Sequence, residues 1–457
     1  MGVFGSSGVR GIANEDVTPR YVLELAVAAG TELEGDRIAL ARDTRRTGGM
    51  LADAAASGLA SVGLDVDRLG QLATPGLQYY CASEGVPGVM ITASHNPPAY
   101  NGMKLIGADG IELTRQRLDQ VEERLAIGGG GDATWDEVGQ ARAVDGVARE
   151  YVESVAAAVD REAIAAADLT VVVDPGHGAA CHSSPDFFRE IGCTVHTVNA
   201  QPDGHFPGRD PEPVAETLGD LCTHVQATDA DLGIAHDGDA DRAMFVDETG
   251  SLLNGNATFA ALVEAAVDAG DTIVSAANAS QRLVDVVERA DADLRLTPIG
   301  STNIISRVRE LQAAGDAVPV AGEGNGGVMF PAYRIARDGA YTAARFLELL
   351  ADGTTASEVV APYDGYHNVR RSASYANDAE REAMLQAIER TATEAVADLD
   401  TTDGFRLNYG DGWVLARPSG TEPVVRIYAE ARSPDRAASL AATFTDPVER
   451  ALENATA

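Results

Sequence analysis

The chain has 457 residues, and 45% of them are apolar, so it can bury the cores of three or four domains. No run approaches the ~20 consecutive apolar residues that cross a bilayer, and the N-terminus lacks the basic start and apolar run of a secretion signal. The 70 acidic residues outnumber the 35 basic ones and give a net charge of −35, which argues against nucleic acid or an anionic membrane as a partner.

The cysteine and lysine contents indicate the cellular environment of the protein. Four cysteines without paired metal-site spacing fit a reduced, cytoplasmic protein. An acidic excess with a single lysine resembles adaptation to a high-salt cytoplasm, because salt screens the self-repulsion of such a surface. Since every other basic residue is arginine, we expect Lys104 to have a role that needs an ammonium group; a chance survivor on the surface is the alternative.

Short β-rich runs alternate with longer stretches at helical spacing through most of the chain. The predicted strands are 38–41, 88–92, 169–173, 232–235, 244–246 and 272–274. The predicted helices are 20–29, 50–62, 115–126, 151–159, 258–269 and 340–350. This alternation predicts α/β units with a parallel or mixed sheet. The tail differs, because a helix over 379–399, a turn at Asp411-Gly412 and a strand over 424–429 predict a smaller α+β domain.

Two loops near the N-terminus combine small residues, hydroxyls and basic side chains. One is Phe4-Gly5-Ser6-Ser7-Gly8-Val9-Arg10-Gly11, and the other is Thr92-Ala93-Ser94-His95-Asn96-Pro97, with Lys104 soon after it. A strand end before a tight Asn-Pro turn is a good place to present the hydroxyl of Ser94 in a cleft. Neither loop is a Walker, Rossmann or G-x-S-x-G motif, and each alone fits an ordinary structural loop as well.

Three aspartates at alternating positions, Asp237, Asp239 and Asp241, follow an apolar predicted strand. Clustered carboxylates repel one another, and a divalent cation relieves this by taking their oxygens as ligands. With Glu248 twelfth in line, the segment superficially matches a calcium-binding EF-hand loop. Arg242 stands where that loop needs glycine, however, and the flanks are predicted strands. We therefore predict a divalent metal site, with a solvated acidic turn as the alternative.

Two later loops carry groups that suit a phosphorylated sugar. Gly322-Glu323-Gly324-Asn325-Gly326-Gly327, after a predicted strand at 318–320, offers a carboxylate and an amide, which are usual partners of sugar hydroxyls. Arg417-Pro418-Ser419-Gly420-Thr421-Glu422-Pro423, followed by Arg426, offers hydroxyls, a bare backbone N–H and guanidinium groups for phosphate oxygens. An ordinary turn is the alternative for each.

Taken together and in this order, these segments resemble the α-D-phosphohexomutase family, which includes phosphoglucomutase, phosphomannomutase and phosphoglucosamine mutase. The resemblance covers nearly the whole chain. It implies an α/β fold of four domains around a central cleft, with three related α/β domains of mixed sheets and a smaller C-terminal α+β domain. We expect these domains at 1–140, 141–250, 251–357 and 358–457. Asn325-Gly326-Gly327, where many bacterial relatives carry Ser and then Gly-His, resembles the archaeal branch, and the composition makes it a halophile-like member.

The resemblance also implies a role for each matching residue. Ser94 would carry the phosphoryl group, and its phosphate would complete a Mg²⁺ site made by Asp237, Asp239 and Asp241. The other implied catalytic residues are Arg10, His95 and Lys104, with Lys104 a candidate for proton transfer at the sugar hydroxyl. The implied substrate-binding residues are Arg242, Glu323, Gly324 and Asn325. The residues implied to grip the non-reacting phosphate are Arg417, Ser419, Gly420, Thr421 and Arg426.

The implied reaction interconverts hexose 1-phosphate and hexose 6-phosphate through a phosphoserine and a hexose 1,6-bisphosphate, which also acts as primer. Phosphomannomutase/phosphoglucomutase activity is favoured, and phosphoglucosamine mutase is the alternative, so glucose, mannose and glucosamine all stay open. A phosphatase that uses the aspartate cluster as nucleophile and a non-catalytic sugar-phosphate sensor are further alternatives. The expected partner is the phosphosugar, bound by a monomer or a homodimer.

Overall fold

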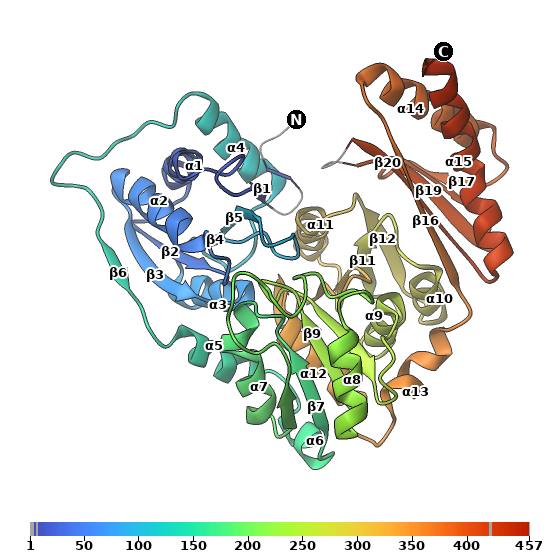
Figure 1. Ribbon diagram of the computed structural model, residues 1–457, viewed down its shortest axis with the longest axis horizontal. Coiled ribbons are helices and arrows are strands. Elements are labelled where there is room, and N and C mark those ends of the chain that lie inside the picture. Colours follow the sequence, from blue (N-terminus) through green and yellow to red (C-terminus); the bar gives the residue numbers. More distant parts are fainter. Residues whose placement is uncertain (1–3, 6–7, 420–422, 457) are drawn as a thin grey trace.

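The computed structural model describes residues 4–5, 8–419 and 423–456. They form four sheets, each of which is the centre of one domain, and we number these domains I to IV along the chain (Figure 1). Within this described part, none of the helices combines the length and the apolar character that spanning a membrane requires.

Domain I is built on a six-stranded sheet of order β1-β5-β4-β2-β3-β6, in which β5 is antiparallel to both of its neighbours and the other strands all run in one direction. Its elements are β1 (Val9–Ile12), α1 (Pro19–Glu32), β2 (Arg37–Arg42), α2 (Gly48–Ser61), β3 (Asp65–Gln71), α3 (Thr74–Glu84), β4 (Gly88–Ile91), β5 (Tyr100–Ile106), α4 (Arg115–Ala126) and β6 (Ala141–Ala143). Every residue of β4 is buried, which explains its uninterrupted apolar sequence. The loop that carries Ser94 joins β4 to β5.

Domain II has a four-stranded sheet of order β10-β9-β7-β8, parallel except for the β9–β10 hairpin. Its elements are α5 (Val147–Ala156), α6 (Arg161–Ala166), β7 (Thr170–Asp174), the 3₁₀ turn Ala179–His182, α7 (Ser184–Glu190), β8 (Thr194–Thr197), α8 (Gly219–Thr228), β9 (Leu232–His236) and β10 (Ala243–Asp247). The three aspartates lie in the β9–β10 turn. Because strands flank this turn on both sides, the structure confirms that it is not an EF-hand.

Domain III has a five-stranded mixed sheet of order β12-β11-β13-β14-β15. Its elements are α9 (Gly255–Glu264), β11 (Thr272–Ala276), α10 (Gln281–Arg289), β12 (Asp293–Thr297), α11 (Ser301–Ala314), β13 (Ala321–Gly322), β14 (Val328–Phe330), β15 (Arg334–Arg337), α12 (Gly339–Glu348) and α13 (Ala356–Val360). The strand predicted at 318–320 was misplaced, since the ladder begins at Ala321. Pro319 has no N–H to donate to such a ladder.

Domain IV has a five-stranded sheet of order β16-β20-β19-β18-β17, antiparallel throughout. Its elements are β16 (His367–Ser374), α14 (Asp378–Glu394), β17 (Asp398–Asp400), β18 (Phe405–Asn408), β19 (Gly412–Pro418), β20 (Val424–Ala431) and α15 (Pro434–Thr456). The helix predicted to reach residue 399 ends at Glu394, because Asp398–Asp400 pairs with β18 as an edge strand. Three mixed α/β domains and a smaller antiparallel one confirm the predicted fold class.

The carboxylate of Glu430 in β20 fastens domain IV to domain III. It is 1% exposed and accepts hydrogen bonds from the Ser280 hydroxyl at 2.9 Å and the Gln281 amide at 2.5 Å, at the N-terminus of α10. It also accepts one at 3.0 Å from Arg282, whose guanidinium donates to the carbonyl oxygen of Tyr363 in the linker between the two domains. A carboxylate at a helix N-terminus is favoured by the helix dipole. One buried charge therefore holds both the domain and its linker in place.

We predict that Glu430→Ala lowers the free energy of unfolding by about 3–5 kcal/mol, because it leaves the buried Arg282 guanidinium without its counter-charge. Denaturant unfolding and limited proteolysis of the linker would measure this. The control is Asp411→Ala, which breaks the exposed ion pair with Arg436 in the same domain and should cost less than about 1 kcal/mol. Equal losses in the two variants would contradict an anchoring role for Glu430.

Candidate active site

Ser94 is held in a tight turn directly after β4. Its φ of 51° lies in the left-handed region, and its backbone N–H donates to the Thr92 hydroxyl at 2.9 Å. The Ser94 hydroxyl donates to Asp237 Oδ2 at 2.7 Å and lies 3.4 Å from His95 Nδ1. The buried Ser94 hydroxyl thus faces the aspartates of domain II.

A buried guanidinium fixes the path of the Ser94 loop, and the sequence analysis did not identify it. Arg45 is 1% exposed, and its Nε donates to Asp43 Oδ2 at 3.0 Å. The carbonyl oxygens that accept its Nη hydrogens at 2.6–3.0 Å belong to Ser94, Asn96, Pro97 and Tyr100. The only sequence signal was an Asp-Thr-Arg directly after an apolar strand, in a chain where basic residues are scarce. Arg45 therefore positions the loop without facing a substrate.

The β9–β10 turn brings together the carboxylates of Asp237, Asp239 and Asp241. All three are buried, and one oxygen of each lies within 4.8 Å of the others. The Oδ1 atom of each is buried without a hydrogen-bond partner in the described structure. Buried oxygens without a partner are costly unless a cation binds them. Three buried carboxylates that lie this close together and each have such an oxygen fit a hard divalent cation such as Mg²⁺.

Cationic side chains of the two neighbouring domains neutralise the Oδ2 atoms of Asp239 and Asp241. Lys104 Nζ, from β5 of domain I, donates to Asp239 Oδ2 at 2.7 Å and to Asp241 Oδ2 at 3.0 Å. Arg337 Nη2, from β15 of domain III, donates to Asp241 Oδ2 at 2.5 Å. Arg337 was missed from sequence, because nothing in its local context distinguishes it from the other arginines. Three domains thus meet at this cluster.

Burial and mutual repulsion set the charges within the cluster. Burial, together with Asp241 and Asp239, raises the pKa of Asp237 to about 7. Burial alone would also raise the pKa of Asp241. The positive charges of Arg337 and Lys104 outweigh burial and hold the pKa of that carboxyl well below its usual range. Burial also disfavours the Lys104 ammonium, yet Asp239 and Asp241 overcome this and raise the pKa of Lys104. Lys104 therefore stays charged at neutral pH.

His95 and Arg10 complete the surroundings of Ser94. The Arg242 charge, burial and the Arg10 charge lower the pKa of His95 to about 2, so its imidazole is neutral at physiological pH. Arg10 Nη1 donates to the side-chain oxygen of Asn96 at 2.9 Å, and β1, which carries Arg10, pairs with the strand of Lys104. The structure thus brings the predicted residues Arg10, Ser94, His95, Lys104 and Arg242 together around the aspartates.

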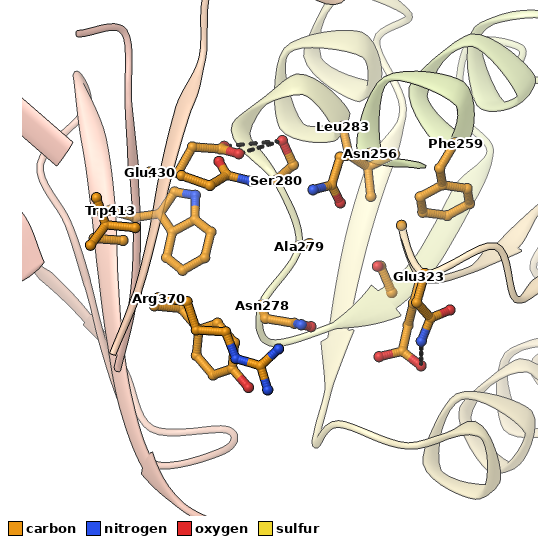
Figure 2. Close-up of a pocket in the computed structure, with 17 residues that line it drawn as sticks. Asn256, Phe259, Asn278, Ala279, Ser280, Leu283, Glu323, Arg370, Trp413 and Glu430 are labelled. Atoms are coloured by element: carbon orange, nitrogen blue, oxygen red, sulfur yellow. Dashed lines mark hydrogen bonds between the residues drawn. The ribbon is translucent and has the colours of Figure 1, made fainter. Parts of the chain in front are cut away.

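Glu323, Gly324 and Asn325 follow β13 and line a cavity of about 300 Å³ between domains III and IV. Figure 2 shows Glu323 at one side of the cavity, with Arg370 and Trp413 of domain IV at the other. Gly324 packs so tightly that a Cβ there would lie 1.9 Å from the side-chain oxygen of Asn256. This loop also contacts the end of the β9–β10 turn, because Ala243 N–H donates to the Gly326 carbonyl oxygen at 3.1 Å.

The predicted phosphate loop joins β19 to β20 in domain IV. Arg417 and Arg426 lie directly opposite each other on these strands, and the N–H of Ser419 donates to the Val424 carbonyl oxygen at 2.8 Å. Gly420 and Thr421 lie outside the described residues. The strand ends that carry this loop face domain I across the molecule (Figure 1). The phosphate loop is therefore presented by a different domain from the Ser94 cluster.

We predict that protons compete with Mg²⁺ for the aspartate turn. Because its pKa is raised, Asp237 holds a proton in the metal-free folded protein between about pH 4 and about pH 7, where the same carboxyl is ionised in the unfolded chain. The contribution of Asp237 to the stability of the metal-free protein should therefore fall as the pH rises through this window, and bound Mg²⁺ should offset this loss. Below about pH 7, Mg²⁺ affinity measured by calorimetry should fall by up to about tenfold per pH unit.

The matched variant is Asp237→Asn, which cannot take up this proton. It should bind Mg²⁺ more weakly but with a flatter pH dependence than the unchanged protein. A Mg²⁺ affinity of the unchanged protein that is constant from about pH 8 to about pH 6 would contradict the competition.

Comparison with known proteins places this arrangement in a family. Four domain families match successive parts of the chain, namely phosphoglucomutase/phosphomannomutase alpha/beta/alpha domain I (residues 1–128), domain II (149–250) and domain III (254–366), and the C-terminal domain (368–446). A phosphoglucomutase/phosphomannomutase from Thermococcus kodakarensis is 40% identical over 446 residues, which cover 95% of this chain and 96% of that protein.

Two further relatives extend the comparison. A probable phosphoglucosamine mutase from Methanopyrus kandleri is 38% identical over 457 residues, which cover 98% of each chain. The crystal structure of a phosphoglucomutase/phosphomannomutase family protein from Burkholderia thailandensis matches with a TM-score of 0.83 at 27% identity, covering 99% of this chain and 97% of that one. The chain therefore belongs to the phosphoglucomutase/phosphomannomutase family of α-D-phosphohexomutases and is an isomerase, a phosphomutase.

Proposed function

We propose that this enzyme interconverts hexose 1-phosphate and hexose 6-phosphate through a phosphoserine at Ser94. The observation that carries the proposal is the Ser94 hydroxyl, which lies 2.7 Å from Asp237 beside three aspartate oxygens without hydrogen-bond partners. Asp237, Asp239 and Asp241 would hold Mg²⁺, together with an oxygen of the Ser94 phosphate. The bound cation supplies positive charge that stabilises the phosphoryl group during its transfer.

The side chains around Ser94 have matching tasks. Phosphoryl transfer needs alignment and charge neutralisation more than covalent assistance, and the Arg10 guanidinium and the Lys104 ammonium supply both next to Ser94. Lys104, held charged by two carboxylates, can donate a proton to the sugar oxygen that leaves when the phosphoryl group returns to Ser94. Neutral His95 accepts or donates one hydrogen bond at the Ser94 oxygen rather than carrying charge.

A mutase must bind its bisphosphate intermediate in two opposite orientations, so that either phosphate can face Ser94. In our proposal Arg417, Ser419, Gly420, Thr421 and Arg426 bind whichever phosphate is not reacting. Arg242, Glu323, Gly324 and Asn325 contact the sugar between the two phosphates. Hexose 1,6-bisphosphate would prime the enzyme by phosphorylating Ser94, because it is also the intermediate that forms in each cycle.

The identity of the hexose rests on the sugar loop and on the relatives. We favour glucose and mannose phosphates, in line with the name of the relative that shares 40% identity. Glucosamine phosphate is the alternative, because the relative at 38% identity is named a probable phosphoglucosamine mutase. Glucose, mannose and glucosamine phosphates are all compatible with a carboxylate at position 323 and an amide at position 325, since these groups bind hydroxyls and amines alike.

The test is a mutase assay in molar KCl with Mg²⁺ and a trace of glucose 1,6-bisphosphate. It offers glucose, mannose and glucosamine 1-phosphates in parallel and measures the 6-phosphates that form. We predict conversion of at least one sugar, and a loss of about a thousandfold or more in kcat for Ser94→Ala, because this variant has no hydroxyl to accept the phosphoryl group.

Ser83→Ala is the control, because Ser83 is an exposed serine in the last turn of α3 whose hydroxyl donates only to the local Tyr80 carbonyl oxygen. It should retain full activity. Release of free phosphate without isomerisation would indicate a phosphatase, and binding without any reaction would indicate a sensor. Either result, or near-normal turnover in Ser94→Ala, would overturn the proposal.

A further inference from the structure

We propose that Asp403 positions the Arg417 guanidinium for the phosphate that is not reacting and ties it to domain III. This inference rests on the proposed function, in which Arg417 belongs to the phosphate loop. Asp403 lies in the connection between β17 and β18 and matches none of the segments that carry the family resemblance. It is assigned the role of a positioning residue, since it acts through Arg417 and does not touch the substrate.

The ion pair between Asp403 and Arg417 is short and largely shielded from solvent. Arg417 Nε lies 2.8 Å from Asp403 Oδ2, and each side chain is only 14% exposed. Water and salt therefore screen this pair less than they screen a surface ion pair. Such shielding allows one carboxylate to hold one guanidinium in place even when the ionic strength is high.

The backbone places Asp403 beside Arg417 through a glycine. β18 begins at Phe405, which pairs with Ala416, so the two residues before it run alongside Arg417. Gly404 has a φ of +85°, and a Cβ there would lie 2.4 Å from the Ala416 carbonyl oxygen and 2.7 Å from Arg417 Cβ. Only glycine fits this close approach. The contact between the Asp403 segment and the arginine is thus built into the chain.

The same carboxylate oxygen also reaches another domain. Asp403 Oδ2 accepts a hydrogen bond at 2.9 Å from the N–H of Ile299, in the loop of domain III between β12 and α11. Arg417, in domain IV, is therefore connected through one oxygen atom to the domain that carries the sugar loop. This fixes where a phosphate bound by Arg417 lies relative to the sugar hydroxyls.

Asp403 places a counter-charge where Arg417 lies directly opposite another arginine, Arg426. The two arginines are directly paired across the antiparallel ladder, so their side chains leave the same face of the sheet and repel each other. A carboxylate at the Nε edge holds one of them against this repulsion. A guanidinium has donors on several edges, so its terminal nitrogens can still bind two phosphate oxygens while the carboxylate of Asp403 forms an ion pair at the Nε edge.

The experiment measures binding without turnover. In the Ser94→Ala background, calorimetry in molar KCl determines the Kd of glucose 6-phosphate, mannose 6-phosphate and glucosamine 6-phosphate. Asp403→Asn keeps an oxygen that can accept from Ile299 but removes the charge opposite Arg417. We expect this variant to raise the Kd of the tightest-binding phosphate by about tenfold. Asp403→Glu, which restores the charge, should recover part of the affinity.

Steady-state kinetics on chains with Ser94 intact separate positioning from a general structural effect. Asp403→Asn should raise KM by about tenfold and change kcat by less than about threefold, because the reacting groups are untouched. The control is Asp411→Asn, which removes an exposed ion pair at the opposite end of β19 and should change neither constant.

The outcomes distinguish this inference from the function on which it rests. If the Ser94→Ala chain binds none of the three phosphates, the proposed function fails. If it binds one of them and Asp403→Asn binds it with the same Kd, the positioning role alone is overturned. The positioning role is also overturned if Asp403→Asn lowers kcat at an unchanged KM, or if Asp403→Glu binds the phosphate no better than Asp403→Asn does.

Discussion

The structure depends on the burial of three aspartates within 4.8 Å of one another. Such a cluster is unfavourable on its own, because each carboxylate loses its hydration and repels the other two. It is stabilised by Lys104 from domain I and Arg337 from domain III, each bonded to Asp241 of domain II. The β9–β10 turn is therefore also the point where three domains are joined. Cationic side chains neutralise one oxygen of Asp239 and one of Asp241, the Ser94 hydroxyl donates to one oxygen of Asp237, and the other oxygen of each aspartate has no hydrogen-bond partner in the described structure.

The loops that meet at this cluster are both fixed by the same device, a buried arginine paired with an aspartate at a strand end. In domain I, Arg45 pairs with Asp43 and binds the Ser94 carbonyl oxygen at 2.7 Å. In domain II, Arg209 pairs with Asp174 at 2.8 Å. It also donates at 2.6 Å to the carbonyl oxygen of His236, which directly precedes the β9–β10 turn. Arginine suits this task because its planar, permanently charged group donates to several acceptors at once. Two rigid loops thus bring a hydroxyl and a carboxylate to hydrogen-bond distance.

Local sequence was sufficient to predict candidate site residues where a short motif brings the chemically relevant groups together by itself. Asp237, Asp239 and Asp241 alternate along one turn, and Ser94 follows a buried strand, so both positions could be predicted before any contact was known. Lys104 was singled out by composition, and the structure places it on two of the aspartates. That the rest of the composition reflects a high-salt habitat stays a prediction.

Contacts made between distant parts of the chain could not be predicted in this way. Arg337 reaches Asp241 across 96 residues of sequence, and Arg45 reaches Ser94 across 49, so neither has a local signal. The helix expected to run to residue 399 ends early for a related reason, since residues 398–400 join a ladder whose partner strand follows them. Helical spacing alone does not report such pairing. Local sequence patterns therefore predict the motifs, but they do not predict the tertiary contacts of the residues.

The measurement that tests the central claim most directly is the site of phosphorylation after incubation with Mg²⁺ and glucose 1,6-bisphosphate, mapped by tandem mass spectrometry of proteolytic peptides. We predict one phosphoryl group on Ser94, stable to hydroxylamine as a serine ester is, and, when it carries an isotopic label, transferred into the hexose phosphates when unlabelled substrate hexose monophosphate is added. A hydroxylamine-sensitive phosphate on Asp237, Asp239 or Asp241, or no covalent phosphate at all, would contradict it.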